Sequence, residues 1–192
     1  MMRLSALVLA LAFAGCTRSA DPRLYTLVPK RGTQTYPSSN TIVVRRPTVA
    51  GYLDRRDIVM GIDRDKLEVA GDANWAEPLD AMVGRVLAED LAQRLPNSRV
   101  LTDLNTLGAV SDLRVDIEFS RFDHGEDGLV LRAMVALHRG FEAQPPWLDS
   151  VELRAKGDVR GTREFVAALD GLVAQLADRI AQVVANPPAT VR

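Results

Sequence analysis

The chain has 192 residues, with 24 basic and 25 acidic side chains and a formal net charge of −1 at pH 7. This near-neutral balance gives no indication that the protein binds nucleic acid or an anionic lipid surface. Because the sequence contains a single cysteine, a disulfide within the chain and a zinc site built from thiolates are both excluded. With 47% hydrophobic but only 5% aromatic residues, the core is expected to be mostly aliphatic.

Residues 1–15 have the features of a secretion signal. Arg3 supplies a positive start, residues 4–13 form an apolar run broken only by Ser5, and two small residues lead directly to Cys16. The run is too short to span a bilayer, which requires about 20 apolar residues. We therefore predict a bacterial lipoprotein signal that is cleaved before Cys16, whose thiol then carries palmitate-type acyl chains. An ordinary signal peptide with a chance cysteine at its end is the alternative.

Lipidation of Cys16 would give a stable membrane anchor, because each buried methylene contributes about 0.8 kcal/mol and several acyl chains are attached. Thr17 follows the cysteine, and the absence of aspartate there favours the outer membrane of a Gram-negative bacterium, on its periplasmic face. We predict a lipidated tether over residues 16–23, one periplasmic domain over residues 24–186 and a tail over residues 187–192.

Short strands and a hairpin are predicted in the first half of the domain. Residues 24–28 and 41–45 are runs of apolar and β-branched residues bounded by turn-forming residues. Residues 57–62 and 66–70 flank an Asp-Arg-Asp sequence, an arrangement that is typical of a β-hairpin.

Two amphipathic helices are predicted from apolar residues at three- and four-residue spacing. The first is expected to begin with Asn74 as its N-cap, to have Glu77 in a capping box and to end before Pro96. The second is expected to begin with Thr162 as its cap and to end at Asn186. Charged and polar residues are expected on the solvent-exposed sides of these helices: Glu89, Asp90, Gln93 and Arg94 on the first, and Asp170, Gln175, Asp178 and Arg179 on the second.

Three runs with strict apolar–polar alternation lie between the helices, at residues 113–119, 129–138 and 151–159. A period of two with one apolar face is typical of β-strands, and the short links between the runs favour antiparallel neighbours. The predicted fold is therefore α/β: a mixed β-sheet with an antiparallel meander, covered on one face by two long helices.

No catalytic signature is found in the sequence, neither a nucleophile elbow, nor a phosphate-binding loop, nor a zinc-protease motif. His124 and His138 are interpreted as residues of a loop edge and a strand end. A metal site formed by both histidines with Asp123 or Asp127 is a weaker alternative. We expect no enzymatic activity, no metal and no cofactor.

Three stretches together resemble a known family: LYTL at residues 24–27, YLDR at 52–55 and WAEPL at 75–79. In this order they are similar to the ABC-type transport auxiliary lipoprotein family (PqiC/YmbA type). The resemblance covers most of the predicted domain. It implies a mixed α/β fold related to anticodon-binding-like and TolB N-terminal domains, and a protein without catalysis of its own.

The resemblance also implies a location and partners. Members are outer-membrane lipoproteins that face the periplasm and serve as auxiliary, docking subunits of ABC-linked lipid-transport systems that maintain membrane integrity. The implied partner is a protein with mammalian-cell-entry (MCE) domains, and a ring-like homo-oligomer is implied by some relatives. A lipid-binding shuttle or chaperone is the alternative, and a periplasmic hydrolase using the His124 region ranks far behind.

A partner-binding site is predicted at Tyr52, Leu53, Asp54 and Arg55, in a turn of the chain. An aromatic residue beside an arginine in an exposed loop has the composition of an interface anchor. The alternative of equal weight is that Tyr52 and Leu53 attach the loop to the domain's own core, while Asp54 and Arg55 pair locally. Trp75 is interpreted as a core residue.

Overall fold

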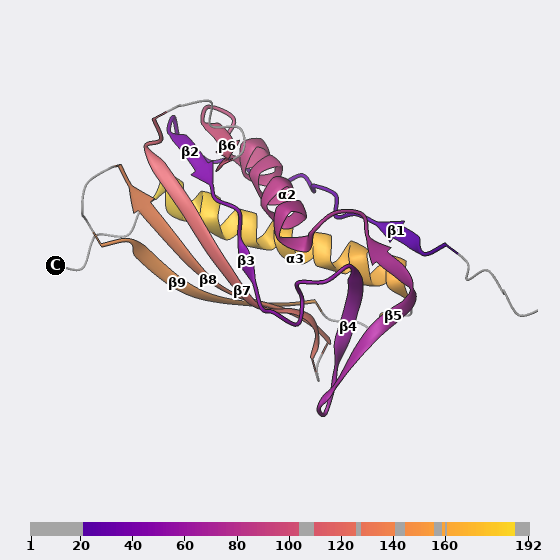
Figure 1. Ribbon diagram of the computed structural model, residues 1–192. Coiled ribbons are helices and arrows are strands. Elements are labelled where there is room, and N and C mark those ends of the chain that lie inside the picture. The colour runs from indigo at the N-terminus through magenta and orange to yellow at the C-terminus, as the bar shows by residue number, and fades with distance from the viewer. Residues whose placement is uncertain are drawn as a thin grey trace, which may run out of the picture.

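The computed structural model describes residues 21–103, 110–125, 128–140, 145–155, 159 and 161–186 (Figure 1). The predicted signal peptide, Cys16 and the tail lie outside these residues. The described strands are β1 (Arg23–Tyr25), β2 (Thr41–Val44), β3 (Thr48–Val49), β4 (Asp57–Asp63), β5 (Lys66–Trp75), β6 (Arg99–Thr102), β7 (Leu113–Gly125), β8 (Gly128–Arg139) and β9 (Trp147–Ala155). The described helices are α2 (Leu79–Arg94) and α3 (Thr162–Ala185).

Strand β7 organises the sheet. One of its edges pairs antiparallel with β8, which in turn pairs antiparallel with β9, so the predicted meander is confirmed. Its other edge is occupied in succession by three parallel segments, with Ile42 of β2 opposite Leu113, Thr48 of β3 opposite Glu118 and Gly61 of β4 opposite His124. Strand β6 extends the sheet beyond β2, and β5 and β1 extend it beyond β4.

The core lies between one face of this sheet and the two helices (Figure 1). Alternate residues of β8 are buried, from Leu129 to Leu137, whereas Arg132 and Met134 between them are exposed on the opposite face. This alternation follows from the pleat of a strand, in which successive side chains point to opposite faces. The α/β class and the helix-covered sheet face are therefore as predicted. Strand β9 begins earlier than predicted, at Trp147, and ends at Ala155.

The helix starts differ from the prediction. Asn74 does not cap a helix but belongs to β5, because it pairs with Leu24 of β1 on one side and with Asp57 of β4 on the other. These two ladders continue the strand to Trp75, and α2 begins only after Pro78. Thr162 is the first residue of α3 and makes no capping bond. Neither described helix is long and apolar enough to cross a membrane.

A segment without regular structure, residues 27–36, is hydrogen-bonded to both helices, and we call it the strap. The backbone N–H of Val28 donates to Asp170 of α3 at 3.0 Å, and that of Lys30 donates to Asp90 of α2 at 2.7 Å. Asp90, Arg94 and Asp170 are therefore buried, so the prediction that they face solvent was wrong. Helical periodicity separates these polar residues from the apolar stripes, but it does not show that another segment of the chain covers them.

Candidate functional site

Two of the stretches that carried the family resemblance, residues 52–55 and 75–79, lie against each other. The backbone N–H of Trp75 donates to the carbonyl oxygen of Arg56 at 2.8 Å and joins the loop to the end of β5. Between them is a cavity of about 440 Å³, which we call the loop–helix pocket. Its lining residues are Asp54, Arg55, Arg56, Trp75, Ala76, Glu77 and Pro78.

Two of the four predicted partner-binding residues attach the loop to the domain. Leu53 is buried in the core, with 2% of its surface exposed. The Tyr52 hydroxyl hydrogen-bonds to the buried carboxylate of Asp123, which also accepts from Nε of Arg121 at 3.0 Å. Burial, followed by the bond to Asp123, raises the pKa of the Tyr52 hydroxyl. These contacts are those expected if Tyr52 and Leu53 hold the loop in place.

Asp54 and Arg55, in contrast, are exposed at the rim of the loop–helix pocket. Nε of Arg55 lies 3.5 Å from a carboxylate oxygen of Asp57, a local and solvent-exposed ion pair. Such pairs contribute little to stability, so both side chains remain accessible for other interactions. Partner binding by the loop stays a prediction, and these two residues, together with exposed Arg56, are its accessible members.

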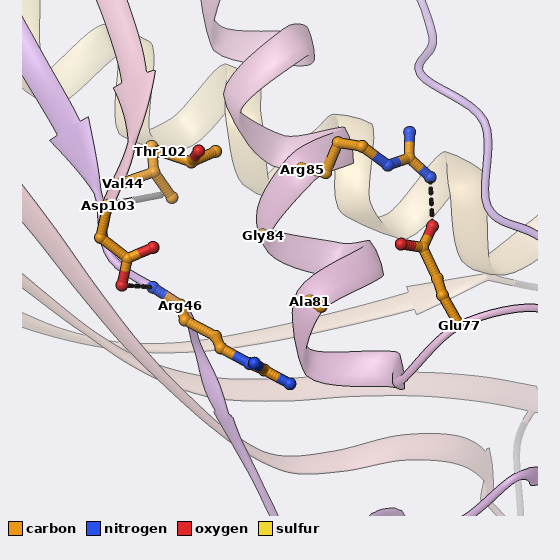
Figure 2. Close-up of a pocket in the computed structure, with 8 residues that line it drawn as sticks. All are labelled: Val44, Arg46, Glu77, Ala81, Gly84, Arg85, Thr102 and Asp103. Carbon is orange, nitrogen blue, oxygen red and sulfur yellow. Dashed lines mark hydrogen bonds and ion pairs between the residues drawn. The ribbon is translucent and has the colours of Figure 1, made fainter. Parts of the chain in front are cut away.

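A second cavity of about 180 Å³, which we call the strand–helix pocket, lies between α2 and the ends of β2 and β6 (Figure 2). The Arg46 guanidinium donates to both carboxylate oxygens of Asp80, at 2.6 and 2.8 Å, and this bond lowers the pKa of Asp80. On the other side, Arg85 donates to Glu77 at 2.7 Å. Because Glu77 lines both pockets, they adjoin each other across this side chain.

The approach of α2 to the chain after β2 depends on Gly84, which lines the strand–helix pocket. A Cβ atom at this position would lie 2.8 Å from Cδ of Pro47, closer than carbon atoms approach one another. Any larger residue at position 84 would therefore push α2 away from Pro47. The roles of Gly84, Arg46 and Arg85 were not predicted from the sequence. The i,i+4 spacing of Arg85 and Glu89 on α2 is the one local signal for any of their contacts.

The two pockets offer alternating positive and negative groups at a partly apolar surface, which suits recognition of a polar protein segment. His124 was predicted at a loop edge but belongs to β7 and stacks on Phe165, while His138 lies near the end of β8, with Nε2 3.0 Å from Asp116. The histidines lie at opposite ends of the β7–β8 pair, and Asp127 lies outside the described residues. No group of three or more potential metal ligands occurs within the described part of the chain.

Comparison with known proteins gives one family and two informative structures. The family described as "ABC-type transport auxiliary lipoprotein component" matches residues 25–181. A crystal structure of an uncharacterized protein superposes with a TM-score of 0.70 at 22% identity, covering 85% of this chain and 99% of its own. A Xanthomonas campestris protein of family DUF330 superposes with a TM-score of 0.64 at 14% identity, covering 84% and 94%. At these identities the likeness shows the fold alone. No curated protein matches the sequence.

Proposed function

Because this chain belongs to the family of ABC-type transport auxiliary lipoprotein components, we propose that it is an outer-membrane lipoprotein that docks an ABC-linked lipid-transport system in the periplasm. Its anchor is Cys16, its partner is an MCE-domain protein of that system, and it catalyses no reaction itself. The family match over residues 25–181 carries this proposal, because it spans both stretches that form the loop–helix pocket.

The two adjoining pockets are the proposed docking surface. The loop–helix pocket is lined by Asp54, Arg55 and Arg56 together with Trp75, and the strand–helix pocket continues this surface along α2. Arginine beside a buried aromatic residue is a composition enriched at protein–protein interfaces. Charged side chains around both cavities also favour a polar protein segment over an acyl chain, since removing charged groups from water to contact hydrocarbon costs free energy.

The test is affinity purification of the full-length lipidated protein from membranes, followed by mass spectrometry of the proteins and lipids that accompany it. We expect an MCE-domain protein in the eluate and recovery of the complex with the outer-membrane fraction. Replacement of Cys16 by serine should release the protein from membranes. A lipidated protein that carries stoichiometric bound lipid, and no such partner, would overturn the docking role in favour of a lipid shuttle.

The docking surface is tested with a double substitution, Arg55→Ala and Arg56→Ala. Both side chains are exposed, so the free energy of unfolding should change by no more than about 0.5 kcal/mol. Recovery of the partner should fall strongly. The matched control is Arg139→Ala, which removes an exposed arginine at the end of β8 and should leave recovery unchanged. Equal recovery of the partner with the wild type, the double variant and the control would mean that the docking surface lies elsewhere on the domain.

A further inference from the structure

We infer that the end of the domain that carries β1 lies against the membrane, with Leu24 and Val28 in contact with the lipid surface. This inference rests on the proposed lipidation of Cys16. It adds an orientation to the anchor and a second, non-covalent membrane contact. Three features of the structure support it: the reach of the tether, the rigid attachment of the segment that follows it, and the exposure of these two apolar side chains.

The tether restricts which part of the domain is near the bilayer. The chain from Cys16 to Asp21, the first described residue, spans at most about 18 Å when fully extended. Helix α3, in comparison, is about 36 Å long, since each helical residue rises 1.5 Å. In Figure 1, β1 lies near the N-terminal end of α3, and the C-terminal end of that helix lies at the far end of the molecule. An anchored domain therefore keeps its β1 end close to the membrane.

The segment after the tether is held firmly to the body of the domain. Residues 23–25 pair with residues 73–75 of β5 as strand β1. The strap continues from there, bonded through its backbone to α3 and α2, and Nζ of Lys30 donates to the carbonyl oxygen of Ala167 at 2.8 Å. Because this attachment begins directly after the tether, the position of the anchor also limits the orientation of the helices and the sheet.

Two large apolar side chains on this same segment are turned away from the core. Leu24 is 64% exposed and Val28 is 49% exposed, whereas Leu27 between them is 1% exposed and packs in the core. These side chains follow directly after the anchored tether, so the chain itself keeps residue 24 close to the bilayer. We therefore identify the lipid surface as the apolar surface that covers them. Contact with acyl chains and headgroups would remove this apolar surface from water.

The test uses the fact that the natural sequence has one cysteine, which lipidation consumes. In full-length lipidated protein, Leu24→Cys then introduces the only free thiol, and a fluorophore attached there reports its surroundings. The protein is reconstituted into vesicles of phosphatidylethanolamine and phosphatidylglycerol that contain a spin-labelled lipid. Lipid contact at position 24 should quench the fluorophore strongly. Val28→Cys provides a second position on the same segment of the chain.

Leu148→Cys is the matched control, because Leu148 is a similarly exposed leucine (61%) on a distant strand. Its neighbour Asp149 accepts a hydrogen bond from Nε of Arg179 at 2.6 Å. Along α3, Arg179 lies about 14 Å beyond Asp170, which accepts the hydrogen bond from Val28. A fluorophore at position 148 should therefore show no quenching by the spin-labelled lipid.

The possible results separate the orientation from the anchor. Quenching at positions 24 and 28 but not at 148 supports the inference. The orientation alone is overturned if mass spectrometry shows the acyl chains on Cys16 but quenching is equal at all three positions, or stronger at position 148. The anchor and the orientation are both overturned if mass spectrometry shows no acyl chains on Cys16. If the label at position 24 is shielded from water without any lipid quenching, a protein contact covers this surface and the inference is wrong.

Discussion

Two regions of this domain use the same residue types, arginine and carboxylate, for different purposes. One is the buried junction between the strap and the helices, which consists of Lys30, Asp90, Arg94, Asp170 and Asp178. The other is the pair of surface pockets, where Arg85 and Glu77 face each other at 2.7 Å. The side chain of Arg94 is 1% exposed, whereas that of Arg85 is 40% exposed.

The difference in burial determines what each arginine does. In the junction, Arg94 donates to Asp178 and to the backbone carbonyl oxygens of Lys30 and Ala174, so one guanidinium joins the strap, α2 and α3. In the pockets, Arg46 pairs with Asp80 and Arg85 pairs with Glu77 in contact with solvent, and such exposed ion pairs contribute less to stability. Burial makes the first group structural, while exposure leaves the second group available for a partner.

The largest expected effect comes from Arg94→Met. Loss of the guanidinium leaves the Asp178 carboxylate and the carbonyl oxygens of Lys30 and Ala174 without this donor, so the free energy of unfolding should fall by about 3–5 kcal/mol. Urea denaturation followed by circular dichroism measures this change. A loss similar to that of a surface arginine would show that the junction is not structural, and would end the comparison.

Two helix glycines, one in each region, sharpen the comparison. Gly84→Ala places a methyl group 2.8 Å from Pro47, and this overpacking should destabilise the domain by about 1–3 kcal/mol. Gly171→Ala meets only Nζ of Lys30, at 4.0 Å, and should stabilise α3 by about 0.5–1 kcal/mol through helix propensity. Thermal unfolding of both variants gives the two signs. Stabilisation by Gly84→Ala would contradict the close approach of α2 to Pro47.

The junction should also make stability depend on pH. Burial raises the pKa of Asp90 from 3.8 to about 6, and the nearby carboxylates of Asp170 and Asp178 on α3 raise it further. The hydrogen bond from the backbone N–H of Lys30 and the guanidinium of Arg94, 3.8 Å away, lower this pKa but do not cancel the effect of burial. Among the described residues, its second oxygen has no hydrogen-bond partner. Because this native pKa exceeds the unfolded one, the native state binds the proton more tightly. Stability is therefore lost as the pH rises through about 6.

This dependence is measured by comparing the wild type with Asp90→Asn. From about pH 5 to about pH 7 the wild type should lose about 1.4 kcal/mol of stability more than the variant, the energy of one pKa unit. Asp170, whose pKa burial also raises, is present in both proteins, so its contribution cancels. Parallel pH profiles would show that Asp90 does not titrate in this range.

The smallest effect is expected for Arg85→Ala in the pockets. Its ion pairs with Glu77 and Glu89 are partly exposed, so their loss should change the free energy of unfolding by less than about 1 kcal/mol, and by less still in high salt. Denaturation at two salt concentrations checks this. A loss as large as that of Arg94→Met would show that the pocket charges are structural as well.

Much of the fold was predictable because it is encoded in local patterns. The alternation of residues 113–119 and 129–138 required strands with one buried face, and both runs are strands in the structure. The start of α2 was not predictable, because Asn74 has the properties of a cap and only its pairing with β1 and β4 keeps it in a strand. The loop–helix pocket was not predicted: the sequence marked residues 52–55 and 75–79 as family motifs, but it did not show that they lie against each other.

The sequence by itself determined the N-terminal signal pattern, the alternating strands, the apolar stripes of two helices and the motifs of a family. Each of these depends on residues that are close together along the chain. The tertiary structure alone decided which charges are buried: Asp90 and Arg94 lie beneath the strap, whereas Glu89, the residue next to Asp90 on α2, is exposed. It also decided that Tyr52 bonds to Asp123 while Arg55 faces solvent, because burial depends on which distant segments cover a side chain.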